Sequence, residues 1–246
     1  MLDWIWDGKM DCGWEDLSKL LKDSSVKFVN IMSKTTAISF NAESKNLINN
    51  ECMERFKQLT ELVANLIEDA PYYAYEDLKN TSQNASKLNC WILLGSLTET
   101  ALQMFLAFYI DDYKNTKWQL WENFKTEQVK EPIMNCINDL VGNKVIDNNQ
   151  AKSLKEAIKE TIKEHTNEHS VQKIMLDELI QFYSKLDLMD KDDINYLKII
   201  QSNRNGIHSF QSRSIGTWSD LQFSIRFFCY LLDWIENHLP DITDYE

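Results

Sequence analysis

Glycine and proline are scarce in this chain, with six and three residues among 246. All-β folds need many turns built from these two residues, so their scarcity argues against a β-sandwich or barrel and favours long helices joined by polar loops. A hydrophobic fraction of 43% is sufficient for a large core. The sequence therefore predicts an all-α protein.

Several motifs of common enzymes and of secreted proteins are also missing. There is no glycine-rich phosphate loop and no Gly-x-Ser-x-Gly elbow, so neither NTP hydrolysis nor serine esterase chemistry is supported. The five cysteines form no Cys-x-x-Cys pair, which is typical of reduced thiols in a cytosolic protein. The N-terminus has neither the basic region nor the apolar core of a signal peptide. We therefore expect a cytoplasmic protein without a cofactor.

The most apolar stretch, residues 88–110, is interrupted by polar residues. A buried central helix over residues 85–112 explains this pattern better than a membrane span, so we expect no membrane partner. Small or polar residues at three- and four-residue spacing form one stripe on this helix: Gly95, Ser96, Glu99 and Gln103. Because a buried carboxylate is costly without a partner, Glu99 is expected to face a cation.

Apolar periodicity predicts further helices along the chain. The last of them is expected to start with a capping box at Ser219, in which the side chains of the first and fourth residues each accept the backbone N–H of the other. The predicted helices are residues 46–69, 130–141, 149–167, 170–188, 191–203 and 219–238.

Acidic residues outnumber basic ones by 38 to 26, and the net charge is −12. This charge disfavours non-specific binding along a nucleic acid, which depends on neutralising many phosphates. Residues 194–219, however, contain no Asp or Glu, although Lys198, Arg204 and Arg213 are present. An acid-free segment in an acidic chain predicts a local surface that faces an anion.

This segment contains Arg204-Asn205-Gly206-Ile207-His208, at the end of the predicted helix 191–203. Arg204 and His208 are four residues apart, so on a helix they share one face. A fixed positive charge beside a titratable base can hold a phosphate and act on it. The alternative is structural, with both side chains capping the negative end of a helix dipole.

The motif 204–208, together with Leu94-Gly95-Ser96-x-x-Glu99, resembles the HEPN superfamily of helical-bundle proteins. Many of its members are metal-independent RNases of toxin–antitoxin or antiviral defence systems. The resemblance implies a HEPN-like antiparallel helical bundle over residues 85–246, with a helical N-terminal extension over residues 1–84. It also implies a homodimer whose two motifs meet in one cleft, with RNA as substrate and an antitoxin or defence-system protein as partner. The apolar stripes of helices 85–112 and 191–203 are candidates for the dimer interface.

The resulting hypothesis is an endoribonuclease in which Arg204 stabilises charge on the phosphate and His208 is the general base or acid. Asn205 would orient either group, and the resemblance implies that Glu99 faces both. Lys198 and Arg213 are candidate RNA contacts. The alternative is a catalytically inactive HEPN-like module that binds RNA, a nucleotide or a protein partner. The short spacer between Arg204 and His208 and the acidic surface favour this alternative.

A second histidine motif, residues 165–169, matches His-x-x-Glu-His, an arrangement that binds zinc in some proteases. It lies in a segment rich in Lys and Glu, and no third ligand with a supporting context follows it. A solvated helix face is the better interpretation, so we expect no metal site.

Overall fold

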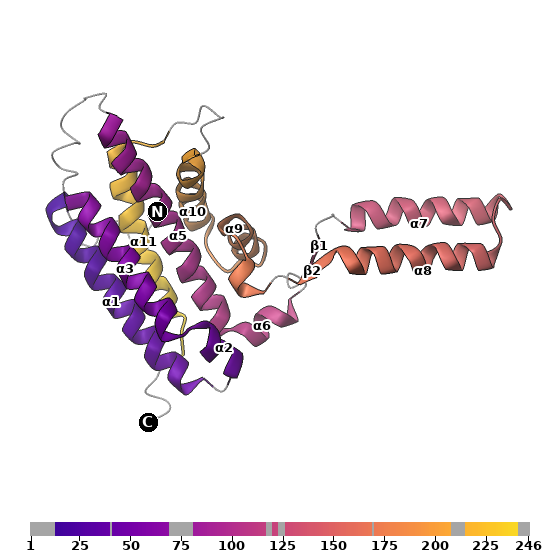
Figure 1. Cartoon of the computed structure of the whole chain (residues 1–246), viewed down its shortest axis with the longest axis horizontal. Helices are drawn as coiled ribbons and strands as arrows, with labels where there is room; N and C mark the ends of the chain where they lie inside the picture. The colour runs from indigo at the N-terminus through magenta and orange to yellow at the C-terminus, as the bar shows by residue number, and fades with distance from the viewer. Residues whose placement is uncertain are drawn as a thin grey trace. The chain divides into compact units, whose positions relative to one another are not determined.

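The computed structural model describes residues 13–39, 41–68, 81–116, 120–122, 126–168, 170–207 and 215–240. Nearly all of them lie in helices (Figure 1), so the predicted all-α fold is confirmed. The described residues also contain one short antiparallel pair of strands, β1 (Leu120–Glu122) and β2 (Thr166–Glu168), which the sequence did not predict. The chain forms two compact units: unit 1 comprises Met1–Ile110 and Ile174–Glu246, and unit 2 comprises Asp111–Lys173.

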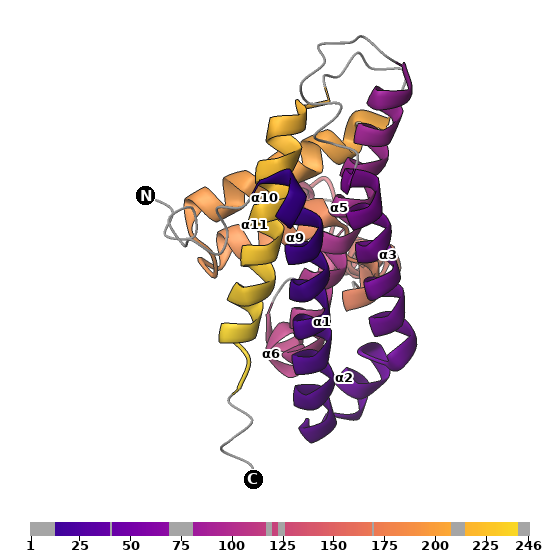
Figure 2. The same cartoon turned by 90° about the vertical axis from the view of Figure 1, so that its left-hand side faces the viewer.

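Unit 1 is organised around α5 (Thr81–Phe108), the central helix that its apolar surface predicts. Three long helices pack on α5, and the first helix packs in turn on two of them, as Figures 1 and 2 both show. The three are α3 (Asn50–Glu68), α10 (Lys191–Arg204) and α11 (Trp218–Asn237), and the first helix is α1 (Trp14–Ile38), which contacts α3 and α11.

Aromatic side chains from different helices fill the core of unit 1. The ring of Phe56 on α3 lies 5.3 Å from that of Phe28 on α1 and 6.2 Å from that of Phe228 on α11, measured between ring centroids. All three side chains are buried, as is Trp91 on α5. Complete burial of such a side chain contributes roughly 2–3 kcal/mol, so these contacts tie α1, α3 and α11 into one core.

The described part of the N-terminal region is helical, as predicted, and it shares the core of unit 1 with the C-terminal helices. α1 buries Leu17, Leu21 and Phe28, and the short helix α2 (Ala42–Leu47) follows it. The compact units therefore do not separate the chain near residue 84. The division into an extension and a HEPN-like domain stays a prediction from the resemblance.

Two helix starts differ from their predicted positions because side chains outside the apolar pattern cap them. The expected helix 46–69 begins instead at Asn50, because Asn49 Oδ1 accepts the N–H of Cys52 at 2.9 Å. The expected capping box at Ser219 is wrong by two residues. The cap is Thr217, whose Oγ1 accepts the N–H of Asp220 at 3.1 Å while the Asp220 carboxylate accepts the N–H of Thr217 at 2.6 Å.

Unit 2 contains a helical hairpin formed by α7 (Thr126–Gly142) and α8 (Asn148–His165). A capping box starts α8: Gln150 and Asp147 each donate a backbone N–H to the other's side chain, at 2.8 and 3.0 Å. Lys155 Nζ on α8 donates to Asn138 Oδ1 on α7 at 2.7 Å. Among its described residues, unit 2 also contains β1, β2, most of α6 (Ile110–Asn115) and a 3-10 turn, η3 (Val171–Lys173).

One helix segment among the described residues, Ala85–Phe108 within α5, is long and apolar enough to cross a membrane. Buried residues make up 61% of its most apolar window, as in the core helix of a globular protein. A core helix and a membrane span both satisfy this criterion, so the segment is weak evidence for a membrane span.

Candidate functional site

An ion pair between Arg204 and Glu99 lies at the centre of the candidate site. Arg204 is the last residue of α10, and its Nη1 lies 2.9 Å from Oε2 of Glu99 on α5. The two side chains are 29% and 21% exposed. Partial burial makes this pair stronger than a fully solvated one, because the guanidinium and carboxylate are less well screened by water. The expected pairing of Glu99 with a cation of the motif is confirmed.

Gly95 makes room for the Arg204 side chain. A Cβ atom at position 95 would lie 2.6 Å from Cδ of Arg204 and 2.9 Å from its Cγ, closer than non-bonded carbon atoms allow. The group that approaches Gly95 is the aliphatic part of the Arg204 side chain. Glycine at this position lets the guanidinium reach the next turn of α5, where Glu99 lies.

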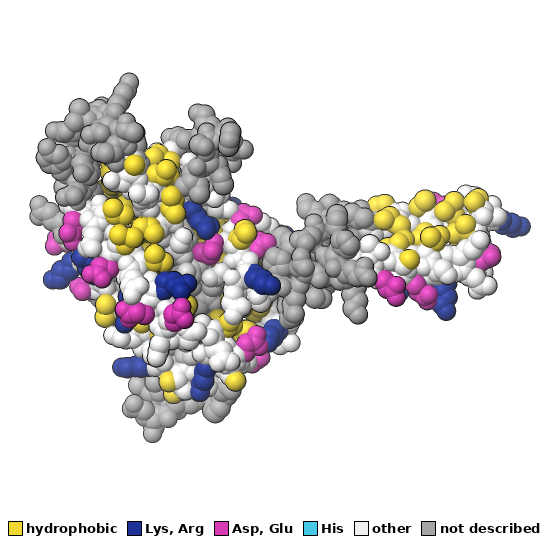
Figure 3. Space-filling model, in the orientation of Figure 1, with side chains coloured by type: hydrophobic (Ala, Val, Ile, Leu, Met, Phe, Trp, Pro, Cys, Tyr) yellow, Lys and Arg dark blue, Asp and Glu magenta, His cyan; other side chains and the backbone are white. Residues whose placement is uncertain are grey.

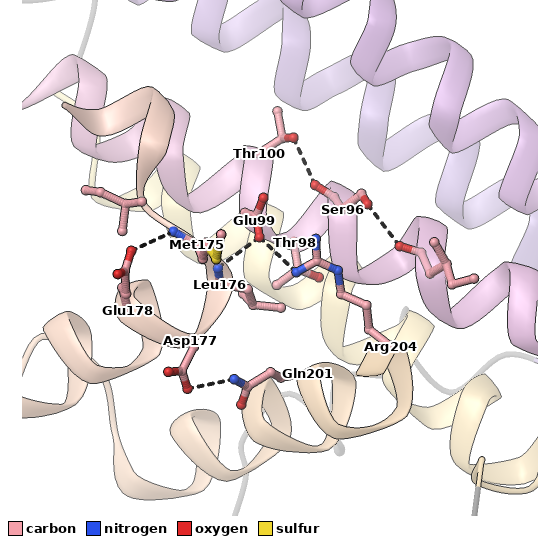
Figure 4. Close-up of polar contacts among 12 residues, drawn as sticks. Ser96, Thr98, Glu99, Thr100, Met175, Leu176, Asp177, Glu178, Gln201 and Arg204 are labelled. Atoms are coloured by element: carbon pink, nitrogen blue, oxygen red, sulfur yellow. Dashed lines mark hydrogen bonds and ion pairs between the residues drawn. The ribbon is translucent and has the colours of Figure 1, made fainter. Parts of the chain in front are cut away.

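The polar stripe of α5 also anchors the start of α9 (Leu176–Lys185). Glu99 Oε2 accepts the backbone N–H of Leu176 at 2.8 Å, and Gln103 Nε2 donates to the carbonyl oxygen of Ile174 at 2.8 Å. The single helix predicted for residues 170–188 is therefore wrong: η3 and α9 are separated at Ile174 and Met175. Figure 4 shows one carboxylate oxygen of Glu99 contacting both α9 and Arg204.

Gln201, one turn before Arg204, links α10 to the same end of α9. Its Nε2 donates to Asp177 Oδ1 at 2.7 Å (Figure 4). This contact was not predicted from the sequence, because a glutamine on a helix surface is usually solvated and carries no distinctive signal.

Asn203 joins the end of α10 to the residues that precede α11. The side chain is buried, its Nδ2 donates to the carbonyl oxygen of Ile199 at 2.9 Å, and its Oδ1 accepts the N–H of Gly216 at 2.6 Å. This residue was not predicted as part of the site either. The sequence does contain a signal that Asn203 is buried, because it lies three residues after Ile200 in the core-facing stripe of α10. An amide buried there needs hydrogen bonds within the protein.

The motif changes helix type immediately after Arg204. Asn205 is half-buried and forms the C-cap of α10, and the 3-10 turn η4 (Asn205–Ile207) follows. At Gly206, a Cβ atom would lie 2.6 Å from Cγ2 of Ile215. Glycine at this position lets Ile215, in the chain after the motif, pack closely against η4.

The other predicted site residues do not join this ion pair in the described part of the chain. His208 and Arg213 lie outside the described residues. Lys198 is exposed on α10 six residues before Arg204, so the two side chains leave the helix about 120° apart. Of the second histidine motif, His169 and the side chain of His165 also lie outside the described residues, and the described residues contain no group of three side chains that could hold a metal.

Lys87 on α5 is a partly buried cation that was not among the predicted site residues. Burial lowers the pKa of Lys87, and the negative charge of Asp220 partly offsets this effect.

The arrangement leaves Arg204 able to bind an anion. A guanidinium has five N–H donors, and the described residues provide one hydrogen-bond acceptor for it, Glu99. The other donors of this partly exposed group can reach a phosphate while Glu99 keeps the side chain in place. The same geometry is also compatible with a purely structural role that fastens α10 to α5. No protein-family model, curated protein or solved structure matches this chain.

Proposed function

We propose that this protein is a metal-independent endoribonuclease of the HEPN type that acts in the cytoplasm as a toxin or antiviral-defence effector. The observation that supports this proposal is the half-buried Arg204, oriented by Glu99 at the end of α10 within a segment free of acidic residues. An immobilised guanidinium of this kind stabilises charge that develops on a phosphate.

The proposed reaction is an internal transesterification of RNA. A base removes the proton of a ribose 2′-OH, the 2′-oxygen bonds to the adjacent phosphorus, and the bond from phosphorus to the 5′-oxygen breaks as that oxygen gains a proton. The products are a 2′,3′-cyclic phosphate and a 5′-hydroxyl. His208 serves as the base or the acid, and Arg204 stabilises the additional negative charge on the phosphate in the transition state.

The remaining groups have supporting roles in this proposal. Glu99 holds the guanidinium of Arg204 in place, so that less side-chain freedom is lost when the substrate binds. Asn205 orients Arg204 or His208 by hydrogen bonding. Lys198 and Arg213 contact neighbouring phosphates, which would make binding weaker at higher salt concentration. The resemblance adds a homodimer in which two motifs share one cleft, and an antitoxin or defence-system partner.

A second candidate function is a catalytically inactive module that binds RNA, a nucleotide or a protein partner through the same surface. The observation that favours it is that the motif and the residues that contact or flank it have structural roles. Glu99 neutralises Arg204, Asn203 accepts a hydrogen bond from Gly216, and Gly206 accommodates Ile215.

Cleavage of a mixed RNA pool in EDTA by three purified proteins distinguishes the two functions. The proteins are the wild type, His208→Ala and the control His238→Ala. His238 is a suitable control because it lies at the end of α11, where its ring stacks on Trp234 at a centroid distance of 4.1 Å. The nuclease predicts cleavage by the wild type and the control, and at least a hundredfold slower cleavage by His208→Ala, since general acid–base catalysis contributes about 10²–10⁴-fold.

Two results would contradict the nuclease. Equal cleavage by the wild type and His208→Ala would mean that His208 is not catalytic. RNA binding without cleavage by the folded wild type, weakened in Arg204→Lys, would support the inactive module instead. Circular dichroism of each variant shows whether the fold is retained.

A further inference from the structure

Asn203 uses both ends of its amide to join the end of α10 to the chain that leads into α11. Its Nδ2 donates to the carbonyl oxygen of Ile199 at 2.9 Å, and its Oδ1 accepts the N–H of Gly216 at 2.6 Å. The residue is only 9% exposed. Its two partners fix the orientation of the amide, because the reverse orientation would place donor against donor and acceptor against acceptor.

The same two stretches of chain meet at a second point. A Cβ atom at Gly206 would lie 2.6 Å from Cγ2 of Ile215, so this contact requires glycine. Gly216 lies equally close to α10, since a Cβ built there would be 3.2 Å from Oδ1 of Asn203. Residues 208–214 therefore connect two points of the chain that contacts among the described residues hold together.

Both helices have contacts of their own that fix the ends next to this segment. The start of α11 is capped by Thr217 and Asp220, whose backbone and side-chain groups bond each other. The end of α10 is attached to α5 through the ion pair of Arg204 with Glu99. The hydrogen bond that Asn203 accepts therefore neither caps α11 nor attaches α10 to the core. It fixes the chain that runs between them.

We propose that Asn203 is a positioning residue of the ribonuclease, whose bond to Gly216 fixes the segment 208–214 and so keeps His208 in place relative to Arg204. This inference rests on the proposed function, which assigns proton transfer to His208. Asn203 does not itself touch RNA, because it is buried and both of its polar atoms are bonded within the protein. Holding the ends of a short segment reduces the conformational freedom that is lost when the reacting groups align.

The loss of this bond should slow cleavage more than it weakens RNA binding. On the visible face of unit 1, Lys and Arg side chains lie beside Asp and Glu side chains rather than in one basic patch (Figure 3). Such a surface attracts RNA weakly, so catalysis depends on the placement of a few groups. We expect Asn203→Ala to lower kcat by roughly 10–100-fold and to leave KM nearly unchanged, because misplacing a reacting group by about 1 Å can cost 100-fold in rate.

The matched control is Asn49→Ala, at the junction of α2 and α3. Asn49 also uses both ends of its amide: it accepts the N–H of Cys52 at 2.9 Å and donates to the carbonyl oxygen of Asn46 at 3.0 Å. Its removal should leave kcat at the wild-type value. Both constants are measured on one short RNA, and circular dichroism shows that each variant is folded.

Asn203→Asp makes the same bond dependent on pH within one protein. A protonated carboxyl group has one donor and one acceptor, so it can replace the amide, whereas an ionised carboxylate cannot donate to the carbonyl of Ile199. Burial raises the pKa of a carboxyl group. The ratio of kcat to wild type should therefore be at least tenfold higher at about pH 5 than at about pH 8. For Asn49→Asp, an exposed position, the ratio should stay constant.

Limited digestion with trypsin tests the placement of the segment without RNA. Arg213 lies within residues 208–214, and Lys57 lies on α3. Asn203→Ala should be cut after Arg213 at least tenfold faster than wild type, and after Lys57 at the wild-type rate. A general loss of stability would instead accelerate both cuts.

Three results would overturn the inference: an unchanged kcat in Asn203→Ala, the same loss of kcat in Asn49→Ala, or unchanged cutting after Arg213 in Asn203→Ala. A wild type that cleaves no RNA would instead contradict the proposed function. The tryptic digestion then decides alone whether Asn203 fixes the segment, so the two proposals can fail separately.

Discussion

At the scale of single residues, Gly95 decides whether Arg204 can reach Glu99. Gly95→Ala places a methyl group 2.6 Å from Cδ of Arg204, so the ion pair must shift or break. In a helix interior, replacing glycine by alanine is otherwise stabilising by about 0.5–1 kcal/mol. Overpacking costs about 1–3 kcal/mol and outweighs this gain, so we expect a net decrease of about 0.5–2 kcal/mol in the free energy of unfolding. Urea unfolding followed by circular dichroism measures it.

Gly142→Ala is the control for this prediction. No heavy atom lies within 4 Å of a Cβ built at Gly142, the last residue of α7. Its free energy of unfolding should stay within about 0.5 kcal/mol of wild type. If Gly95→Ala were equally neutral, Arg204 would not be confined as the structure indicates.

Asp193 on α10 is a second residue whose surroundings determine a measurable property. Burial raises the pKa of Asp193 to about 6, and the negative charges of Asp190 and Asp192 add to the rise. The Tyr230 hydroxyl, 3.4 Å from Oδ2, opposes it, while Oδ1 is buried and has no hydrogen-bond partner among the described residues. The ionised carboxylate therefore destabilises the folded chain.

Because the pKa of Asp193 is raised, we predict that the folded chain becomes less stable as the pH rises. Between about pH 4 and pH 6 the folded chain binds more protons at Asp193 than the unfolded chain, so the free energy of unfolding falls as the pH rises through this window. Asp193→Asn should remove about 1–3 kcal/mol of this dependence and be more stable than wild type at pH 7 but not at pH 4. Urea titrations at both pH values test it.

Asp192→Asn is the matched control, because Asp192 is exposed on the same turn of α10. It should leave most of the pH dependence in place. A pH dependence that is identical in wild type and Asp193→Asn would contradict the assignment to this carboxylate.

At the scale of elements, the polar stripe of α5 holds α9 and α10 together. Glu99→Ala would leave the N–H of Leu176 without its acceptor and Arg204 without its counter-ion. We expect the free energy of unfolding to fall by about 1–3 kcal/mol, since a partly buried donor and charge both become unsatisfied. Hydrogen exchange of the amides of α9 should accelerate more than that of α3, because the Glu99 carboxylate bonds directly to the first turn of α9.

Glu51→Ala on α3 is the control, because it shows whether the effect is specific to Glu99 or follows from removing any glutamate. Glu51 forms an i,i+4 pair with Arg55 at 2.9 Å, but its side chain is 80% exposed. Removing so exposed a pair should change stability and the exchange of α9 very little. Unchanged exchange of α9 in Glu99→Ala would show that Glu99 does not anchor this helix.

The residues at which helices begin and end were harder to predict than the existence of the helices. The apolar period indicated the helices around α3 and α11, but Asn49 and Thr217 determine where they begin through side-chain hydrogen bonds. The break before α9 depends on Glu99, seventy-seven residues earlier in the chain, and no local pattern reports such an interaction. Local sequence therefore predicts helical content well, and helix boundaries less well.

At the scale of the whole molecule, the amino-acid composition was sufficient to predict the fold class. A simple energetic argument was sufficient to predict part of the site. Scarce glycine and proline predicted helices, and the cost of burying an unpaired Glu99 predicted its ion pair with Arg204. The division into two units and the pairing of β1 with β2 were not predictable, because both join segments that are distant in sequence. Gln201 was missed because a glutamine on a helix surface carries no distinctive signal, and Asn203 was missed although it lies in the core-facing stripe of α10.

The chemical ends of RNA cleaved by the purified protein in EDTA provide the sharpest test of the proposed nuclease. A single RNA and its 2′-O-methylated counterpart are incubated with wild type, and the products are analysed by mass spectrometry. Transesterification at Arg204 and His208 predicts 2′,3′-cyclic phosphate and 5′-hydroxyl ends from the RNA, and no cleavage of the methylated strand, which lacks the nucleophile. Intact RNA, or cleavage of both strands, would contradict the proposed mechanism.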